Sequence, residues 1–174
     1  MGRHDVDELP DEETLRAFSK ALLDDVAALE AMLAAGRFET GVRRIGAEQE
    51  MFLVDEAMLP AAVAPAMLER EHDPRLTSEL AAFDLEANLS PLPYGGRSLS
   101  ALESELHEVL TAARRAAQRE HADVVLAGIL PTVREGDLTL AKMTPSPRYQ
   151  ALNRAMTRLR GGQFAIDIRG VDHL

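Results

Sequence analysis

The stretch Gly46-Ala47-Glu48-Gln49-Glu50-Met51-Phe52-Leu53-Val54-Asp55 places two carboxylates inside an otherwise apolar run that is typical of a β-strand. Because side chains alternate between the two faces of a strand, Glu48 and Glu50 lie on one face with Phe52 and Val54. We therefore expect both glutamates to point into a core. A buried, ionised carboxylate is normally paired with a basic residue, hydrogen-bonded or bound to a metal. Mg²⁺ or a similar cation is the interpretation that accounts for several such acids at once.

A second acidic cluster follows in the stretch ELAAFDLEANLSP, which begins at Glu79. Asp84 and Glu86 share one face of the strand that this stretch predicts. Glu79 lies an odd number of positions before Glu86, which puts it on the opposite face of a continuous strand. A turn within residues 77–82, which Thr77 and Ser78 permit, would bring Glu79 to the same cavity as Glu86.

Length and composition limit the classes of function. The chain of 174 residues fits one domain, and its 46% apolar and 28% charged content is ordinary for a globular protein. The formal net charge of −10 argues against a nucleic-acid partner. The absence of cysteine excludes a disulfide framework, a thiolate nucleophile and a Cys-ligated zinc site. With no apolar secretory segment and no run long enough to span a bilayer, we expect a cytoplasmic protein without a membrane partner.

The remaining pattern alternates helices and strands. A helix is predicted from Asp11 to Ala35, with Gly36 ending it and an apolar stripe to bury. The stripe comprises Leu15, Phe18, Leu22, Val26, Leu29 and Leu33. Strands are predicted at Val42–Val54 and Asp84–Leu89, with a short helical piece at Ala62–Arg70 between them.

The second half of the chain continues in the same way. Ser100-Ala101-Leu102-Glu103 has the form of a capping box that opens a helix, whose buried face is Leu102, Leu106, Val109, Leu110 and Ala113. A buried strand is predicted at Asp123–Leu130, a helix at Pro147–Leu159 ended by Gly161-Gly162, and a strand at Phe164–Ile168. The pattern is mixed α+β.

An ordered set of short motifs resembles the glutamate–cysteine ligase family, in the branch that includes bacterial carboxylate–amine ligases. The resemblance covers roughly residues 40 to 174, and it depends on the order of the motifs because each alone is weak. The motifs are Arg44-Ile45-Gly46-Ala47-Glu48-Gln49-Glu50, Leu76-Thr77-Ser78-Glu79, Leu85-Glu86-Ala87-Asn88-Leu89-Ser90-Pro91, Arg148-Tyr149 and Phe164-Ala165-Ile166-Asp167-Ile168-Arg169-Gly170.

The resemblance implies a glutamine-synthetase-like fold, in which a curved, mainly antiparallel sheet with flanking helices holds ATP and Mg²⁺ on its concave side. It assigns the metal ions to Glu48, Glu50, Glu79 and Glu86. The implied reaction activates a glutamate carboxylate as an acyl phosphate, which an amine then attacks to give an amide. Hard Mg²⁺ prefers the oxygen ligands that such acids supply, and it would neutralise phosphoryl charge.

Asn88 and Arg148 complete the residues assigned to the nucleotide or substrate, beside Glu48, Glu50 and Glu86. Plainer structural roles stay open for each of them. The glutamates of the first cluster would then face solvent or pair with Arg43 or Arg44, and Asn88 would cap a turn. No residue is placed by sequence near an identifiable proton, so no general base or other catalytic residue is assigned.

The chain departs from the better-known branches of the family at two segments. Those branches carry histidine before the proline of a Gly-x-His-Pro segment, and this chain has Gly128-Ile129-Leu130-Pro131. They also carry a later His-Val-His-like strand, and Ile166-Asp167-Ile168 stands at the corresponding stretch. No residue of the chain supports cysteine as the amine acceptor.

The expected organisation is an N-terminal amphipathic helix within residues 1–39, followed by the N-terminal half of a ligase catalytic domain in residues 40–174. Because the family's catalytic domain is longer than this chain, the sheet is expected to be incomplete. Three interpretations follow. The chain is part of an ATP-dependent ligase, a non-catalytic binding or regulatory module completed by a partner, or a protein that self-associates through the stripe on residues 15 to 33.

Overall fold

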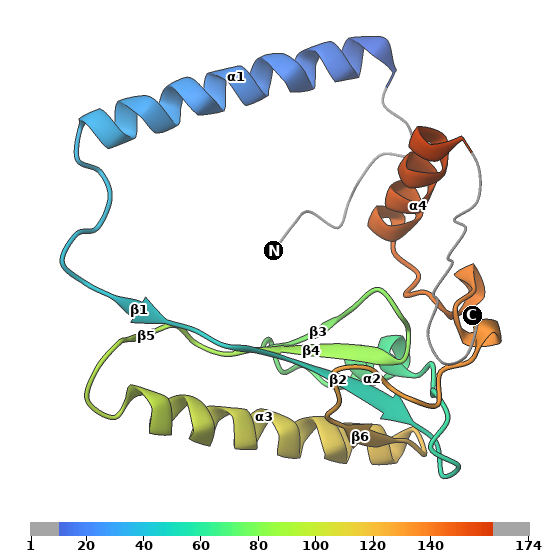
Figure 1. The fold of residues 1–174 in the computed structure, drawn as a ribbon. Helices are drawn as coiled ribbons and strands as arrows, with labels where there is room; N and C mark the ends of the chain where they lie inside the picture. The colour runs from blue at the N-terminus through green and yellow to red at the C-terminus, as the bar shows by residue number, and fades with distance from the viewer. Residues whose placement is uncertain (1–10, 162–174) are drawn as a thin grey trace, which may run out of the picture. The chain divides into compact units, whose positions relative to one another are not determined.

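The computed structural model describes residues 11–161, whose elements alternate between helices and short strands (Figure 1). In chain order they are α1 (Glu12–Ala34), β1 (Arg44–Ile45), β2 (Glu48–Val54), α2 (Ala64–Arg70), β3 (Leu76–Ser78), β4 (Asp84–Asn88), β5 (Leu92–Pro93), α3 (Ser98–Arg119), β6 (Asp123–Val125), two 3₁₀ turns (Glu135–Asp137 and Leu140–Lys142) and α4 (Pro147–Arg160). The chain divides into two compact units. Leu22–Thr144 holds the strands, and the other unit contains α4 and the start of α1.

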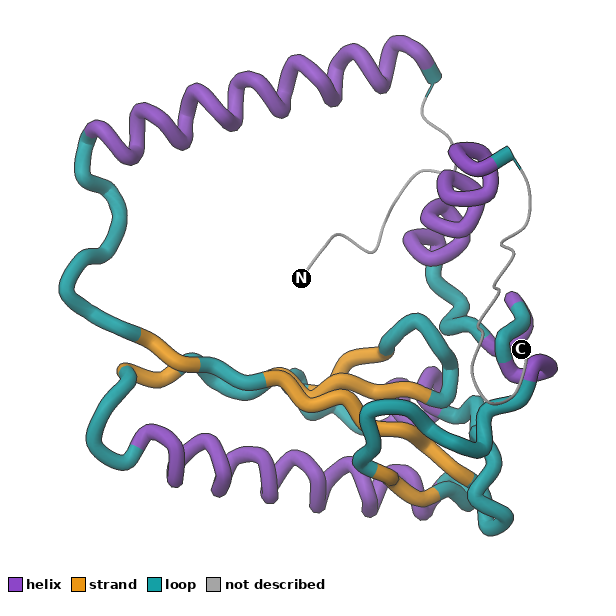
Figure 2. The backbone as a smooth tube through the Cα atoms, viewed as in Figure 1, coloured by secondary structure: helices purple, strands orange, loops and turns teal. Residues whose placement is uncertain are grey.

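The central element is a four-stranded antiparallel sheet in the order β3-β4-β2-β6. Strands β2 and β4 pair along five positions, so that Glu50 lies opposite Glu86 and Met51 lies opposite Leu85. Beyond the end of this pair, β1 and β5 form a two-stranded antiparallel sheet (Figure 2). Both sheets are open, and the expected α+β class is confirmed.

One face of the four-stranded sheet is covered by α2 and α3, whose buried residues share one core with the strands. In Figure 1, α3 runs along the lower side of the strands. Met51 and Leu53 of β2 and Leu85 of β4 are fully buried there against Val109 of α3. The apolar face predicted for α3 is confirmed, since Leu102, Val109, Leu110 and Ala113 are buried and Leu106 packs against the same core. The alternation of β2 therefore separates a core face from a face that no helix of this core covers.

The ends of two helices follow the sequence signals. Asp11 Oδ1 accepts a hydrogen bond from the backbone N–H of Thr14 at 2.8 Å, which caps the start of α1. Gly36 follows the helix with φ +63°, a left-handed conformation that glycine adopts at little cost. Gly161 ends α4 in the same conformation.

Other boundaries differ from the prediction. The strand expected over Val42–Val54 is interrupted between β1 and β2 at Gly46 and Ala47. The strand expected over Asp123–Leu130 ends at Val125, before Gly128 and Pro131 break the extended pattern. The helix α3 begins at Ser98 rather than Ser100, so the predicted capping box is wrong.

The early start of α3 has a local cause. Gly95 and Gly96 both have positive φ and turn the chain immediately before the helix. Ser98 is buried, and its Oγ accepts a hydrogen bond from the Gly95 N–H at 3.2 Å. Ser100 consequently lies inside the first turn and has no capping role.

The apolar stripe of α1 was expected to be buried, and this expectation is wrong for the described residues. None of the side chains of α1 is buried, and Phe18 is 64% exposed. The strand predicted at Phe164–Ile168 lies outside the described residues. Within residues 11–161, none of the helices combines the length and the apolar character needed to cross a bilayer.

The substitution Leu85→Ala should destabilise the folded chain by about 2–5 kcal/mol, because it removes a fully buried side chain from the strand that carries Glu86. Urea unfolding followed by circular dichroism measures this change. Leu99→Ala is the matched control, since Leu99 lies on α3 with 62% of its surface exposed. Equal losses of stability in the two variants would contradict the core described here.

Candidate functional site

Acidic and amide side chains from three neighbouring strands share the sheet face opposite the helices. The register sets Glu48 opposite Asn88, Glu50 opposite Glu86, and Glu86 opposite Thr77 of β3. Residues that face one another across antiparallel strands have Cβ atoms about 5 Å apart. We call this surface, made by Glu48, Glu50, Thr77, Glu79, Asp84, Glu86 and Asn88, the acid face.

The expectation that Glu48 and Glu50 point into the core is wrong. Both residues are exposed, while Met51 and Leu53 on the other face of β2 are fully buried. The error lay in which face the helices cover, because the alternation itself is as predicted. Exposure keeps the two carboxylates hydrated, so no basic partner is needed to offset a cost of burial.

Glu79 reaches the acid face through a hairpin. It follows the last residue of β3, and its N–H bonds the carbonyl of Asp84, the first residue of β4, at 3.4 Å. The chain therefore turns back between Glu79 and Glu86, and the rule for a continuous strand does not apply. Across the hairpin, both side chains lie on the same face of the sheet. Burial raises the pKa of Glu79, and repulsion from Glu86 and Glu50 raises it further.

Asp84 is the most strongly perturbed acid of the face. Burial is the main cause that raises its pKa to about 7, and repulsion from Glu50, Glu79 and Glu86 adds to this shift. Its Oδ1 is buried and has no hydrogen-bond partner among the described residues. Asp84 lies opposite Phe52, whose ring packs 6.5 Å from that of Phe83.

Glu86 is at the centre of the acid face and is held by neighbours on its own side of the sheet. The amide Nδ2 of Asn88 donates to Glu86 Oε1 at 2.5 Å, and Thr77 Oγ1 lies 3.5 Å from the same oxygen. Asn88 Nδ2 also lies 3.3 Å from Thr77 Oγ1. One oxygen of Glu86 is therefore fixed by these contacts.

A cavity of about 560 Å³ opens beside these residues. Its walls are Glu48, Gln49, Glu50 and Glu86 on the sheet and Leu126, Ala127 and Gly128 on the segment after β6. Since β6 pairs with β2 only from Phe52 to Val54, the segment after Val125 diverges and leaves this space. No basic side chain lines the cavity in the described part of the chain.

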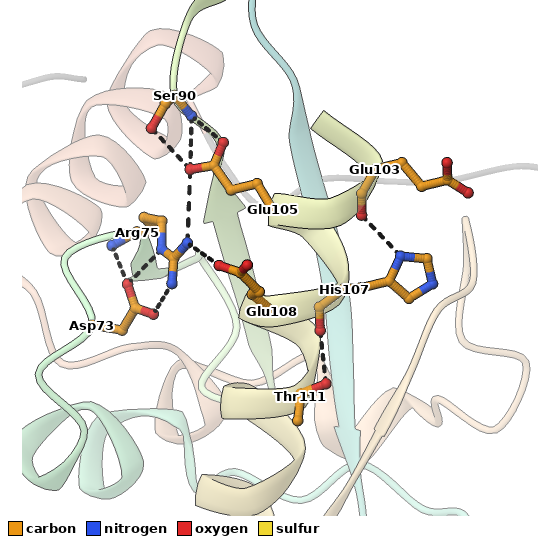
Figure 3. Close-up of polar contacts among 8 residues, drawn as sticks. All are labelled: Asp73, Arg75, Ser90, Glu103, Glu105, His107, Glu108 and Thr111. Carbon is orange, nitrogen blue, oxygen red and sulfur yellow. Dashed lines mark hydrogen bonds and ion pairs between the residues drawn. The ribbon is translucent and has the colours of Figure 1, made fainter. Parts of the chain in front are cut away.

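A polar network on the far end of β4 holds the strand that carries Glu86 and Asn88 (Figure 3). Glu105 of α3 accepts hydrogen bonds from the N–H and Oγ of Ser90 at 3.1 and 2.8 Å. Arg75 pairs with Asp73 at 2.8 Å and with Glu105 at 3.7 Å. The paired guanidinium lowers the pKa of Asp73, chiefly through the hydrogen bond.

The same network is connected to the acid face through the backbone. The carbonyl of Arg75 accepts a hydrogen bond from the N–H of Asn88 at 2.8 Å. Glu108 of α3 adds a second carboxylate to Arg75 at 3.8 Å. The position of Asn88, and with it the contact to Glu86, is thus fixed from α3 as well as from the sheet.

The described side chains do not form a ready-made metal site. In residues 11–161, no group of three or more acidic or histidine side chains converges closely enough to hold an ion. Glu50, Glu79 and Glu86 nonetheless repel Asp84, and Glu50 and Glu86 also repel Glu79. A cation is the kind of ligand that would relieve this repulsion.

Arg148 lies in the other compact unit of the chain, on α4. Its guanidinium carbon is 5.9 Å from the ring centroid of Tyr149, a cation–π contact of ordinary length. Tyr149 itself is buried. The assignment of Arg148 to nucleotide binding stays a prediction.

The profile of glutamate-cysteine ligase family 2 (GCS2) matches residues 44–170. The chain belongs to this family. The match contains β1 to α4 and therefore the entire acid face, and it begins after α1. No curated protein and no solved structure matched the chain.

The departure of this chain from the better-known glutamate–cysteine ligase segments lies beside the cavity. Gly128 lines the cavity next to Glu48 and Glu50. Leu130, which stands where those branches carry histidine, is buried with 3% of its surface exposed.

Two features of the site were missed by sequence reasoning. Asp84 was placed on the face of Glu86 but was not counted among the binding residues, although alternation along β4 supplied the signal. The network of Arg75, Glu105 and Ser90 had no local signal, because its members come from separate elements.

The raised pKa of Asp84 makes stability depend on pH. An unfolded Asp titrates near 3.8, whereas Asp84 in the folded chain titrates near 7. Between these values the folded chain binds more protons than the unfolded chain, so the free energy of unfolding falls as pH rises through this window. Above pH 7, Asp84 is ionised in the folded chain, and its charge lowers the free energy of unfolding in the absence of a cation.

Asp84→Asn should therefore stabilise the ligand-free chain by about 1–4 kcal/mol at pH 8, and most of the gain should vanish at pH 4, where Asp84 of the folded chain is already neutral. Urea unfolding at the two pH values measures the difference. Glu56→Gln, at an exposed position in the loop after β2, is the control and should change little. A stability gain that is the same at both pH values would contradict the proposed repulsion.

Proposed function

We propose that this chain is part of an ATP- and Mg²⁺-dependent carboxylate–amine ligase that forms an amide through a glutamyl acyl phosphate. Membership of the glutamate–cysteine ligase family supports ligase chemistry. The observation that carries the proposal is the acid face, where Glu50, Glu79, Asp84 and Glu86 gather on an open sheet surface without a basic partner among them.

The donor set suits a hard divalent cation. Carboxylate oxygens are the ligands that Mg²⁺ prefers, and the unpartnered Oδ1 of Asp84 is an oxygen that lacks a donor in the described structure. We assign the metal to Glu48, Glu50, Glu79 and Glu86, with Asp84 added beside them. When bound, Mg²⁺ neutralises phosphate charge during phosphoryl transfer.

The residues of the chain perform separate tasks in this proposal. Glu48 and Glu50 present exposed carboxylates at the wall of the cavity, where a polyanion and its cation can enter. Asn88 and Thr77 orient one oxygen of Glu86 and leave the other for a ligand. The half-buried Phe52 and the buried Phe83 pack together beside Asp84, so that this end of the face is poorly hydrated.

The glutamine-synthetase-like architecture is part of the proposal. The open antiparallel sheet with helices on one face agrees with one part of such a fold. On this view the acid face is the concave, nucleotide-holding side, and the assignment of Arg148 to the nucleotide stays a prediction. Glutamate is the proposed carboxylate substrate. The buried, apolar Leu130 offers no polar group that would select an amine, so no particular amine is proposed.

Calorimetric titration of Mg²⁺–ATP into the purified chain tests the function. We expect binding by the wild type and at least about tenfold weaker binding by Glu50→Gln/Glu86→Gln, because two charged ligands are removed from the acid face. Glu56→Gln is the matched control and should bind as the wild type does. Circular dichroism establishes that each variant is folded.

Three results of this titration separate the alternatives. Loss of binding in the acid-face variant alone supports the ligase assignment and justifies assays of amide formation with glutamate and a panel of amines. No binding of Mg²⁺ or Mg²⁺–ATP by the folded wild type contradicts a working site on this chain. Binding of Mg²⁺ without ATP favours the alternative of a non-catalytic cation-binding module, which the absence of basic residues from the described cavity wall would explain.

A further inference from the structure

The helix α1 carries an apolar stripe that the folded core does not use. The six stripe residues, Leu15, Phe18, Leu22, Val26, Leu29 and Leu33, are between 47% and 64% exposed. The core of the sheet unit contains no residue of α1. The helix also precedes the region matched by the family, which begins at residue 44. It is therefore an addition to the family region with an apolar surface of its own.

A membrane surface is a poor match for this helix. Its sequence contains five acidic residues and two basic ones, Arg16 and Lys20. Amphipathic helices that lie on anionic bilayers are rich in Lys and Arg on the polar face. A protein surface with the same apolar pattern is the better complement.

The stripe is self-complementary when two copies of α1 run antiparallel. If the two-fold axis passes beside Leu22, then Leu22 meets Leu22 of the second copy, Phe18 meets Val26, and Leu15 meets Leu29. These pairs are equidistant from Leu22 in sequence, so one register matches five of the six stripe positions at once, and Leu33 falls opposite Asp11 at the end of the pair. Such a contact is isologous, as a two-fold dimer requires.

The charges beside the stripe agree with this register. Arg16 and Glu30 lie on the same side of the stripe by helical periodicity. In the antiparallel register, Arg16 of one copy lies within two residues, or about 3 Å along the axis, of Glu30 of the other. The contact with Glu12 at 2.8 Å does not prevent this, because that pair is exposed and worth little.

We propose that α1 is a dimerisation element that joins two copies of this chain as an antiparallel helix pair centred on Leu22. The interface is formed by the stripe and flanked by two Arg16–Glu30 pairs. It goes beyond the proposed ligase function and does not depend on it, because no acid-face residue takes part.

Cysteine substitution tests the register, since the chain has no native cysteine. In the full chain under mild oxidation, Leu22→Cys should give a disulfide-linked dimer. Leu15→Cys alone should not, whereas an equimolar mixture of Leu15→Cys and Leu29→Cys should form the mixed dimer. Non-reducing gel electrophoresis and mass spectrometry identify the products. Efficient cross-linking of Leu15→Cys to itself would indicate parallel helices and would overturn the proposal.

Analytical ultracentrifugation tests the association itself. We expect the wild type to dimerise and Leu22→Glu to weaken dimerisation by at least about tenfold. Ala31→Glu, on the side of α1 opposite the stripe, is the matched control and should leave the dimer intact. A wild type that is monomeric at every soluble concentration, or a Leu22→Glu variant that dimerises equally well, would refute the interface.

Charge exchange tests the flanking pairs separately from the apolar contact. Arg16→Glu and Glu30→Arg should each weaken the dimer several-fold, because like charges then meet across the interface. The double variant Arg16→Glu/Glu30→Arg should recover most of the lost affinity. Additive losses in the double variant would contradict the antiparallel register.

Discussion

The pairing of β2 with β4 is the constraint on which the rest of the structure depends. In this register Met51 meets Leu85 on one face and Glu50 meets Glu86 on the other. The apolar face is stabilised by burial beneath α2 and α3, and a shift of one residue would exchange the two faces. Packing of the core therefore fixes the positions of the acids, although no acid belongs to the core.

The fold tolerates repulsion on the acid face because burial of apolar side chains on the opposite face stabilises the pairing of β2 with β4. Glu79 and Asp84 are drawn into the cluster by a hairpin whose apolar neighbours are buried, and their raised pKa values record the cost. The Arg75 and Glu105 network attaches the end of β4 to α3 and so limits relaxation away from the cluster. Such destabilising groupings are typical of functional sites, where a ligand offsets the cost.

Alternation along the two strands was enough to predict which residues share a face, and the succession of predicted helices and strands was enough to predict the α+β class. It could not identify the buried face of β2, because that depends on where α3 returns and packs. The position of Glu79 required the hairpin. The raised pKa of Asp84 comes mainly from burial and then from repulsion by Glu50 on a separate strand, and local sequence shows neither. In the same way, the start of α3 was decided by the Gly95 and Gly96 turn rather than by the local capping pattern.

The buried, unpartnered oxygen of Asp84 connects binding of a cation to release of a proton. Near neutral pH this carboxyl is about half protonated, so a cation that binds the acid face displaces a proton from part of the population. Cation uptake and proton release are then two sides of one equilibrium. For the proposed cation, the apparent affinity would fall in acidic solution, and the heat of binding would depend on which buffer accepts the proton.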